Sequence, residues 1–230
     1  MSPTLSVEGV FAGYGQTIVL RDVSLSVEQG EVACVMGRNG AGKTTLLKAL
    51  MGVLPKTGTV RMSGVDLSRQ PGHLINAAGM VWVPQENSVF LGLTVRQHLL
   101  IAMAGSRAEE GIAAAAALFP VLGERLEQEA QTLSGGERKM LGLAQALIVK
   151  PKVVLLDEPT EGVAPVVVEQ LIPAIAAVAR EAAVVLVEQN VDTALALGTR
   201  AHILEQGSIV ETGNVVELHE RGILEQRLAL

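Results

Sequence analysis

The chain has 230 residues, of which 49% are hydrophobic and 18% are charged, so the composition excludes a disordered protein. This length fits one large domain, or a core with a small subdomain. The net charge of −6 and the pI near 5.3 argue against nucleic acid as a partner. The single cysteine, Cys34, allows no internal disulfide. Neither a membrane span nor a secretion signal is predicted.

Strands and helices alternate along most of the chain. The apolar and alternating runs predict strands over residues 5–10, 23–27, 32–36, 59–62, 80–83, 153–156, 183–187, 201–204 and 208–210. Helical patterns follow residues 44–51, 138–149 and 166–180, with a further helical stretch at the C-terminus. From residue 94 to about 131 the pattern is helical, with breaks at Pro120 and Gly123. We therefore expect an α/β core with an inserted helical lobe.

A glycine-rich loop lies between the strand 32–36 and the helix 44–51. Residues 37–44 spell GRNGAGKT, which fits the phosphate-loop pattern G-x-x-x-x-G-K-[ST]. Glycines let the backbone wrap around phosphate oxygens, and N–H groups at a helix start point toward an anion. Lys43 would reach the β- and γ-phosphates, and the Thr44 hydroxyl would hold Mg²⁺. The loop predicts an ATP or GTP site, with nucleotide contacts from Gly37, Asn39, Gly40, Ala41, Gly42, Lys43, Thr44 and Thr45.

Two carboxylates follow the apolar strand 153–156. Asp157, at the carboxyl end of the strand, would bind Mg²⁺ directly or through water, and Glu158 could polarise the water that attacks the γ-phosphate. The alternative is a pair of solvated carboxylates at a strand end. Beside a phosphate loop, the catalytic interpretation is favoured.

A second glycine-rich turn reads LSGGE over residues 133–137, before the helix that begins near Arg138. Its exposed N–H groups would suit an anion, and Ser134 adds a hydroxyl donor. The alternative is a serine N-cap in a glycine-rich turn. Physical reasoning alone leaves both interpretations open.

The phosphate loop, LSGGE and LLDEP (residues 155–159), in this order, resemble the ATP-binding subunits of ABC transporters. The resemblance covers essentially the whole chain. It implies a P-loop NTPase core, a mostly parallel sheet with helices, together with an N-terminal antiparallel β subdomain. It also implies a single ABC ATPase domain over residues 1–230, with a core at about 1–93 and 150–230 and a helical lobe at 94–149 that carries LSGGE.

The same resemblance implies how ATP and Mg²⁺ are bound. Two subunits pair head to tail, so that the phosphate loop of one and Ser134, Gly135, Gly136 and Glu137 of the other hold a shared ATP. Tyr14 resembles the aromatic residue that stacks on adenine; the alternative is an aromatic that packs on a strand. Gln85 resembles the glutamine that touches Mg²⁺ and the membrane subunits; the alternative is a turn residue. Residues 160–162 resemble the loop that crosses the dimer.

One position departs from the family pattern. Where the family usually has a histidine that contacts the γ-phosphate, this chain has Gln189. A glutamine can donate a hydrogen bond to phosphate, but it carries neither a proton nor a positive charge, so the switch role of the histidine is open here. The four histidines lie elsewhere in the pattern, and we expect each to be structural or on the surface.

The glutamine at position 189 also indicates which subfamily the chain resembles. The runs VEQN (187–190), DEPTEGVAP (157–165) and LFP (118–120) resemble the second ATPase subunit of branched-chain amino acid uptake systems. ATPases for urea and short-amide uptake are close relatives, and residues 86–88 match the usual Gly-Arg segment of neither group. The resemblance implies a peripheral subunit on the cytoplasmic face of the inner membrane. Its implied partners are a sister ATPase or a second copy, two membrane permeases and, indirectly, a substrate-binding protein.

Two other classes of function compete with an importer ATPase. A soluble ABC ATPase, such as one for iron–sulfur assembly, would have no membrane partner. A non-hydrolysing binding module is suggested only by Gln189, and Glu158 argues against it.

Overall fold

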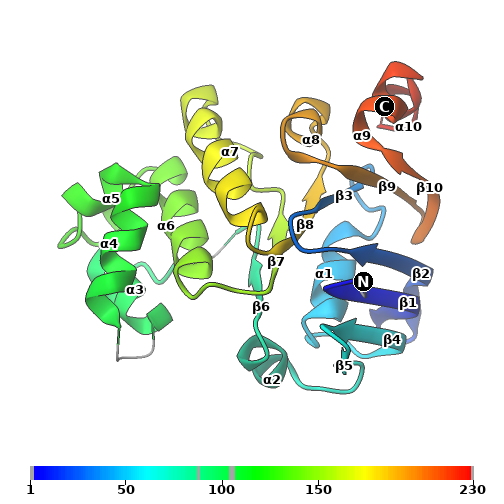
Figure 1. Ribbon diagram of the computed structural model, residues 1–230, viewed down its shortest axis with the longest axis horizontal. Helices are drawn as coiled ribbons and strands as arrows, with labels where there is room; N and C mark the ends of the chain where they lie inside the picture. The colour runs from blue at the N-terminus through cyan, green and yellow to red at the C-terminus, as the bar shows by residue number, and fades with distance from the viewer. Residues whose placement is uncertain (1–2, 87–88, 104–106, 229–230) are drawn as a thin grey trace.

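A six-stranded sheet forms the centre of the protein (Figure 1). The computed structural model describes residues 3–86, 89–103 and 107–228. The strand order is β10-β9-β3-β8-β7-β6, in which all strands except β10 are parallel. β3, β7 and β8 are buried along their whole length, which explains their continuous apolar sequences. The strands are β3 (Val32–Met36), β6 (Met80–Val83), β7 (Val153–Asp157), β8 (Ala183–Glu188), β9 (Arg200–Glu205) and β10 (Ser208–Asn214).

A second, antiparallel sheet has the order β2-β1-β4-β5. Its strands are β1 (Leu5–Tyr14), β2 (Thr17–Val27), β4 (Lys56–Met62) and β5 (Val65–Asp66). The predicted strands 5–10 and 23–27 are too short, because register shifts along the β1–β2 pair interrupt the alternation of apolar residues. β2 also lies beside β10, where Arg21 N donates to Gly207 O at 2.8 Å.

The two faces of the central sheet bury different partners. Side chains such as Val35 and Val185 pack against the antiparallel sheet and helix α1 (Lys43–Leu50). Side chains such as Cys34 and Leu186 pack against the helices on the opposite face. Those helices include α7 (Pro165–Ala179), α8 (Val191–Leu197), α9 (Val215–Glu220) and α10 (Ile223–Leu228). α2 (Gly72–Ala77) precedes β6. The architecture is therefore the predicted α/β core with an antiparallel β subdomain.

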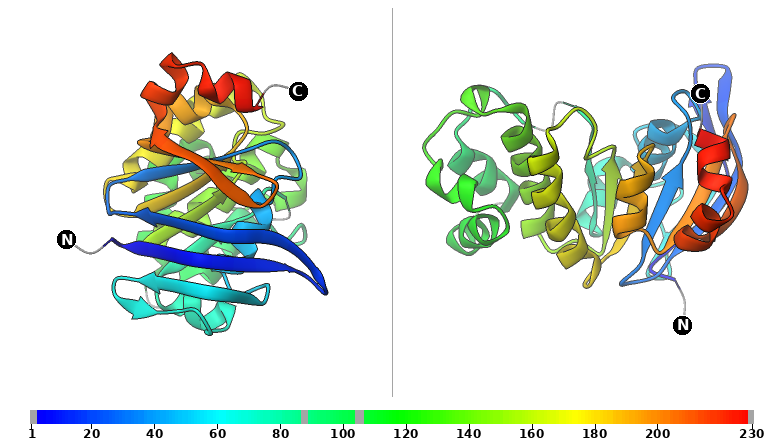
Figure 2. Two further views of the ribbon diagram at one scale, coloured as in Figure 1. Left: turned by 90° about the vertical axis from the view of Figure 1, so that its right-hand side faces the viewer. Right: turned by 90° about the horizontal axis from the view of Figure 1, so that it is seen from above.

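The remaining helices gather at the end of the molecule farthest from the antiparallel sheet (Figure 2). They are α3 (Val95–Met103), α4 (Ala108–Leu118), α5 (Pro120–Glu124), a 3₁₀ turn (Ala130–Thr132) and α6 (Gly135–Ile148). Pro120 separates α4 from α5, as predicted, but Gly123 lies inside α5 and does not end it. A Cβ at Gly123 would lie 2.8 Å from the Cβ of Ala116, so the glycine permits the close approach of α5 to α4.

No helix within the described residues is long and apolar enough to cross a bilayer. The apolar stretch 171–187 is divided between α7 and β8, in agreement with the sequence prediction. Of residues 86–88, Asn87 and Ser88 lie outside the described residues.

Candidate functional site

Four strands end at the same edge of the central sheet. Met36 of β3 is paired with Glu188 of β8, and Val187 is paired with Asp157 of β7. β6 ends at Val83, and Gln85 follows two residues later. Ligands of α/β sheets bind at the carboxyl ends of parallel strands. The phosphate loop, the two acidic residues and Gln85 are thus brought to one edge by the topology.

The phosphate loop joins β3 to α1 through glycines that no other residue could replace without strain. Gly40 and Gly42 have φ angles of 81° and 112°, which lie in the left-handed region. A Cβ at Gly37 would lie 2.4 Å from Leu204 O. No side chain caps the start of α1, so its first N–H groups remain available to an anion.

Lys43, the first residue of α1, is buried and its ammonium group has three oxygen partners. The Nζ atom donates to Gly37 O at 2.7 Å and to Arg38 O at 3.2 Å. It also lies 3.0 Å from Oε1 of Glu158. The lysine therefore connects the phosphate loop with the acidic end of β7.

Thr44 and Asp157 form a second contact between these segments. The Thr44 hydroxyl donates to Asp157 Oδ1 at 3.1 Å. Asp157 is 2% exposed, and burial raises its pKa to about 6. These two oxygen groups fit Mg²⁺, which takes oxygen ligands, and Gln85 lines the same cavity as Thr44. At a nucleotide site Mg²⁺ uses only one or two carboxylates, since phosphates and water complete its shell.

Glu158 presents its carboxylate to the same space. Oε1 contacts Lys43, and Oε2 accepts from Gln85 Nε2 at 3.2 Å. Burial raises the pKa of Glu158, but hydrogen bonds with Glu161 and Lys43 and nearby positive charges outweigh burial and hold the pKa below its usual value. The carboxylate is therefore ionised at neutral pH, the form that can accept a proton from water.

Glu161 is a second carboxylate at the site. Gln85 Nε2 also donates to Glu161 Oε2. The hydrogen bond with Glu158 is the main reason why the pKa of Glu161 lies above its usual value. Sequence reasoning missed Glu161 as a site residue, although it lies within the recognised run 160–162.

These side chains surround a cavity of about 400 Å³. Its lining is Val19, Asn39, Gly40, Gly42, Lys43, Thr44, Thr45, Gln85, Glu158 and Glu161. Most of the predicted phosphate-loop residues are in this lining, together with Gln85 and Glu158. Val19 of β2 was not predicted, since nothing in its sequence context distinguishes it from other apolar strand residues.

Several predicted site residues do not line this cavity. Tyr14 lies at the end of β1 and is 47% exposed, with Lys48 Nζ 5.8 Å from its ring centroid. Gln189 follows β8 and is half-buried. Gly37 and Ala41 belong to the phosphate loop but do not line the cavity. Asp157 does not line the cavity either, but it accepts a hydrogen bond from Thr44, which does.

The segment from Ser134 to Glu137 forms the start of α6, outside the cavity. Ser134 Oγ accepts from Glu137 N at 3.2 Å, and a Glu137 carboxylate oxygen accepts from Ser134 N at 2.8 Å. This capping box agrees with the N-cap interpretation. The N–H groups of Gly135 and Gly136 belong to the first turn, which a helix leaves for acceptors outside itself.

The histidines occupy structural or surface positions. His98 is buried, and its Nε2 accepts from Phe90 N at 2.8 Å. His202 is also buried, which lowers its pKa to about 4. His73 and His219 are exposed. None of the four lines the cavity.

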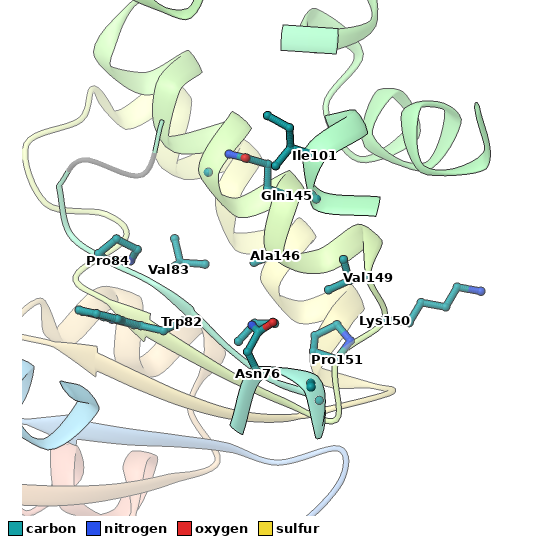
Figure 3. Close-up of a pocket in the computed structure, with 15 residues that line it drawn as sticks. Asn76, Trp82, Val83, Pro84, Ile101, Gln145, Ala146, Val149, Lys150 and Pro151 are labelled. Atoms are coloured by element: carbon teal, nitrogen blue, oxygen red, sulfur yellow. The ribbon is translucent and has the colours of Figure 1, made fainter. Parts of the chain in front are cut away.

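A second cavity of about 500 Å³ lies between β6 and the helices α3 and α6 (Figure 3). Val83 faces it from β6, Trp82 contributes to its lining, and Pro84, which directly precedes Gln85, follows. Ile101 of α3 and Ala146 of α6 line the opposite side. This groove is thus adjacent to the phosphate-loop cavity through the end of β6.

Comparisons with known proteins give a consistent result. The family model described as ABC transporter matches residues 20–161. The high-affinity branched-chain amino acid transport ATP-binding protein BraG of Pseudomonas aeruginosa is 42% identical over 90% of this chain and 91% of its own length. A protein of Archaeoglobus fulgidus named "Probable branched-chain amino acid transport ATP-binding protein LivF" is 37% identical, with 91% of each chain covered. The lipopolysaccharide export system ATP-binding protein LptB of Escherichia coli K12 is 33% identical over 94% of this chain and 92% of its own.

Solved structures agree in fold. An ATP-binding cassette of an ABC transporter in its ADP conformation has a TM-score of 0.87 at 23% identity, with 100% of both chains covered. Another ATP-binding subunit has a TM-score of 0.86 at 24% identity and covers 99% of this chain and 100% of its own.

Proposed function

This chain belongs to the ABC transporter family, and we propose that it is the ATP-hydrolysing subunit of an importer of branched-chain or other hydrophobic amino acids. The observation that carries the proposal is the Glu158 carboxylate, which faces the phosphate-loop ammonium of Lys43 at 3.0 Å. The names of two relatives, BraG and LivF, support the substrate class. The division into a core, about 1–93 and 150–230, and a lobe, 94–149, is part of this proposal.

In the proposed reaction, the phosphate loop and Lys43 hold the phosphates of ATP. Thr44, Asp157 and Gln85 would hold Mg²⁺, which when bound neutralises charge on the phosphates. Glu158 accepts a proton from the water that attacks the γ-phosphate, so no covalent intermediate is formed. Tyr14 would stack on the adenine, since its ring is accessible at the end of β1.

We propose that a second subunit completes the site. In this arrangement Ser134 to Glu137 of one subunit contact the ATP held by the phosphate loop of the other. The position of this segment supports the idea, because it does not line the cavity formed by the phosphate loop of its own chain. The second subunit is a sister ATPase or a second copy, and Gln189 would contact the γ-phosphate by a hydrogen bond alone.

The groove between β6, α3 and α6 is the proposed docking site for a cytoplasmic segment of the membrane permease. Ile101 and Val149, which both line the groove, are 59% and 39% exposed, and exposed apolar side chains gathered in one place are typical of protein contact sites. The groove ends at Pro84, directly before Gln85, so a docked segment would lie close to the catalytic cavity. In this proposal the chain is a peripheral subunit on the cytoplasmic face of the inner membrane, and a substrate-binding protein is an indirect partner.

Uptake by the assembled transporter in proteoliposomes tests the proposal. With ATP inside the vesicles, labelled leucine should accumulate, and Glu158→Gln should abolish that accumulation. Urea, supplied in parallel, should not accumulate. Uptake of urea without leucine would overturn the substrate class, and equal uptake with Glu158→Gln would overturn the assignment of the catalytic carboxylate.

A further inference from the structure

Glu188 is a buried carboxylate that the reaction described above does not use. It is the last residue of β8 and is 2% exposed. Oε1 accepts from the Thr160 hydroxyl at 2.7 Å and from Thr160 N at 3.3 Å. Oε2 accepts from the backbone N–H groups of Gln189 at 3.2 Å and of Asn190 at 3.4 Å. One carboxylate oxygen thus accepts hydrogen bonds from the loop after β7, and the other accepts them from the loop after β8.

The loop after β7 is the one that carries the proposed general base. Thr160 lies two residues beyond Glu158, whose φ angle of 47° is in the left-handed region. A non-glycine residue in this region is strained and persists only where its surroundings hold it. Glu158 N donates to Val187 O at 3.0 Å, and Lys139 of α6 donates to Glu158 O at 3.3 Å. Glu188 adds the side-chain contact that holds the loop from the β8 side.

The bridge holds a carboxylate inside the protein, and this burial has an energetic cost. Burial raises the pKa of Glu188, because a carboxylate loses hydration inside the protein. Hydrogen bonds to both oxygens offset that cost. A glutamine would supply only one acceptor oxygen and would place N–H groups opposite the donors of the other loop.

We propose that Glu188 is a positioning residue for ATP hydrolysis, which fixes Glu158 and Gln189 relative to each other by bridging the loops that carry them. The inference rests on the proposed role of Glu158. Since Glu188 contacts neither the phosphate loop nor the cavity among the described residues, its effect should fall on turnover and not on ATP affinity.

Steady-state ATP hydrolysis by full-length variants tests this role. Glu188→Gln and Thr160→Val should lower kcat by at least about tenfold with KM for ATP changed less than about twofold, because small displacements of a reacting group cost that much. Thr160→Ser keeps the hydroxyl and should retain most of the turnover. Glu31→Gln, which alters a carboxylate paired with Arg200 just before β3, at the end of that strand opposite the phosphate loop, is the matched control and should leave both constants unchanged.

The outcomes distinguish a role of Glu188 in positioning Glu158 from a role in packing alone. Wild-type kcat in Glu188→Gln or in Thr160→Val would overturn the proposal, and so would equal losses in Thr160→Ser and Thr160→Val. A raised KM with unchanged kcat would also contradict it. If Glu188→Gln does not fold, as judged by its thermal unfolding, the two Thr160 variants decide. Absence of hydrolysis in the wild type would instead refute the proposed function.

Discussion

Lys43 is the residue that connects the two halves of the candidate site within this chain. Its ammonium group is shared by two phosphate-loop carbonyls and by Glu158. A bound γ-phosphate would become a further anionic partner of the same group. Lys43 should therefore determine the affinity for the nucleotide, and Glu158 should determine the rate of its hydrolysis.

Replacing Lys43 tests this division of roles. Lys43→Ala should weaken ATP binding by at least about tenfold, because a hydrogen bond to a charged group contributes about 1.5–3 kcal/mol. Isothermal titration calorimetry measures the affinity. Lys152→Ala, at an exposed position before β7, is the control and should bind ATP as the wild type does. Unchanged affinity in Lys43→Ala would contradict the predicted role.

The pKa of Asp157 predicts how stability depends on pH. Burial raises this pKa from 3.8 to about 6, so the fold favours the protonated acid. The stabilisation is present below the unfolded pKa and is lost as the pH rises through about 6. Between pH 8 and pH 5 this group should add about 1.4 kcal/mol to the free energy of unfolding.

Urea unfolding without Mg²⁺, at pH 8 and at pH 5, measures this effect. Asp157→Asn lacks the titrating group and resembles the protonated acid at both values. Its stability advantage over the wild type at pH 8 should shrink by about 1.4 kcal/mol at pH 5. A constant difference between the two proteins would show that the pKa of Asp157 is not raised.

At the level of single residues, the sequence predicted those parts of the site that lie in short local patterns. The phosphate loop is one continuous run, and Asp157 and Glu158 directly follow an apolar strand. Glu188 could not be recognised in this way, since its partner Thr160 is 28 positions earlier in the chain. Such a contact depends on which strands become neighbours, which no local pattern encodes.

At the level of elements, the start of α6 should have two separable effects. Ser134→Ala removes the capping hydrogen bond, which typically costs about 1 kcal/mol of stability. If this turn also contacts the ATP of a second subunit, hydrolysis should fall as well. Asn214→Ala removes the N-cap of α9, far along the chain, and is the matched control.

Both variants should lower the melting temperature, but only Ser134→Ala should reduce ATP turnover. Thermal unfolding and phosphate release, measured on the same samples, distinguish the two effects. Equal turnover in Ser134→Ala and Asn214→Ala would indicate that Ser134 is an N-cap alone.

The groove between β6, α3 and α6 makes a separate prediction. Ile101→Glu places a charge in the proposed permease interface and should abolish ATP-driven uptake by the assembled transporter. Hydrolysis by the isolated subunit should be unchanged, because Ile101 does not line the catalytic cavity. Val216→Glu, at a similarly exposed position on α9, should leave uptake intact. Normal uptake with Ile101→Glu would contradict the assignment of this surface.

Element prediction succeeded where the burial pattern is simple. The bounds of β6 were predicted at residues 80–83, as the structure has them. β1 and β2 were predicted too short, because their register shifts break the alternation on which the prediction relies. Gly123 was taken as a helix break, whereas it allows two helices to pack closely, which is a property of the tertiary structure.

At the level of the whole molecule, the family and the fold followed from three motifs in one order. The comparisons confirm the family over most of the chain. The substrate class rests on the names of two relatives, since the two cavities described above are the phosphate-loop cavity and a groove beside it. In the proposed assembly, partner proteins select the substrate.

The central claim is that Glu158 is the general base for ATP hydrolysis, at a site which a second subunit completes. Phosphate release and molecular mass, measured on Glu158→Gln with ATP and Mg²⁺, test it most directly, with Gln189→Ala as the comparison. Hydrolysis by Glu158→Gln should fall at least about 100-fold, as expected for loss of a general base, while ATP remains bound and a dimer forms. Gln189→Ala should lose less turnover. Near-normal hydrolysis by Glu158→Gln, or a monomer with ATP bound, would contradict the account.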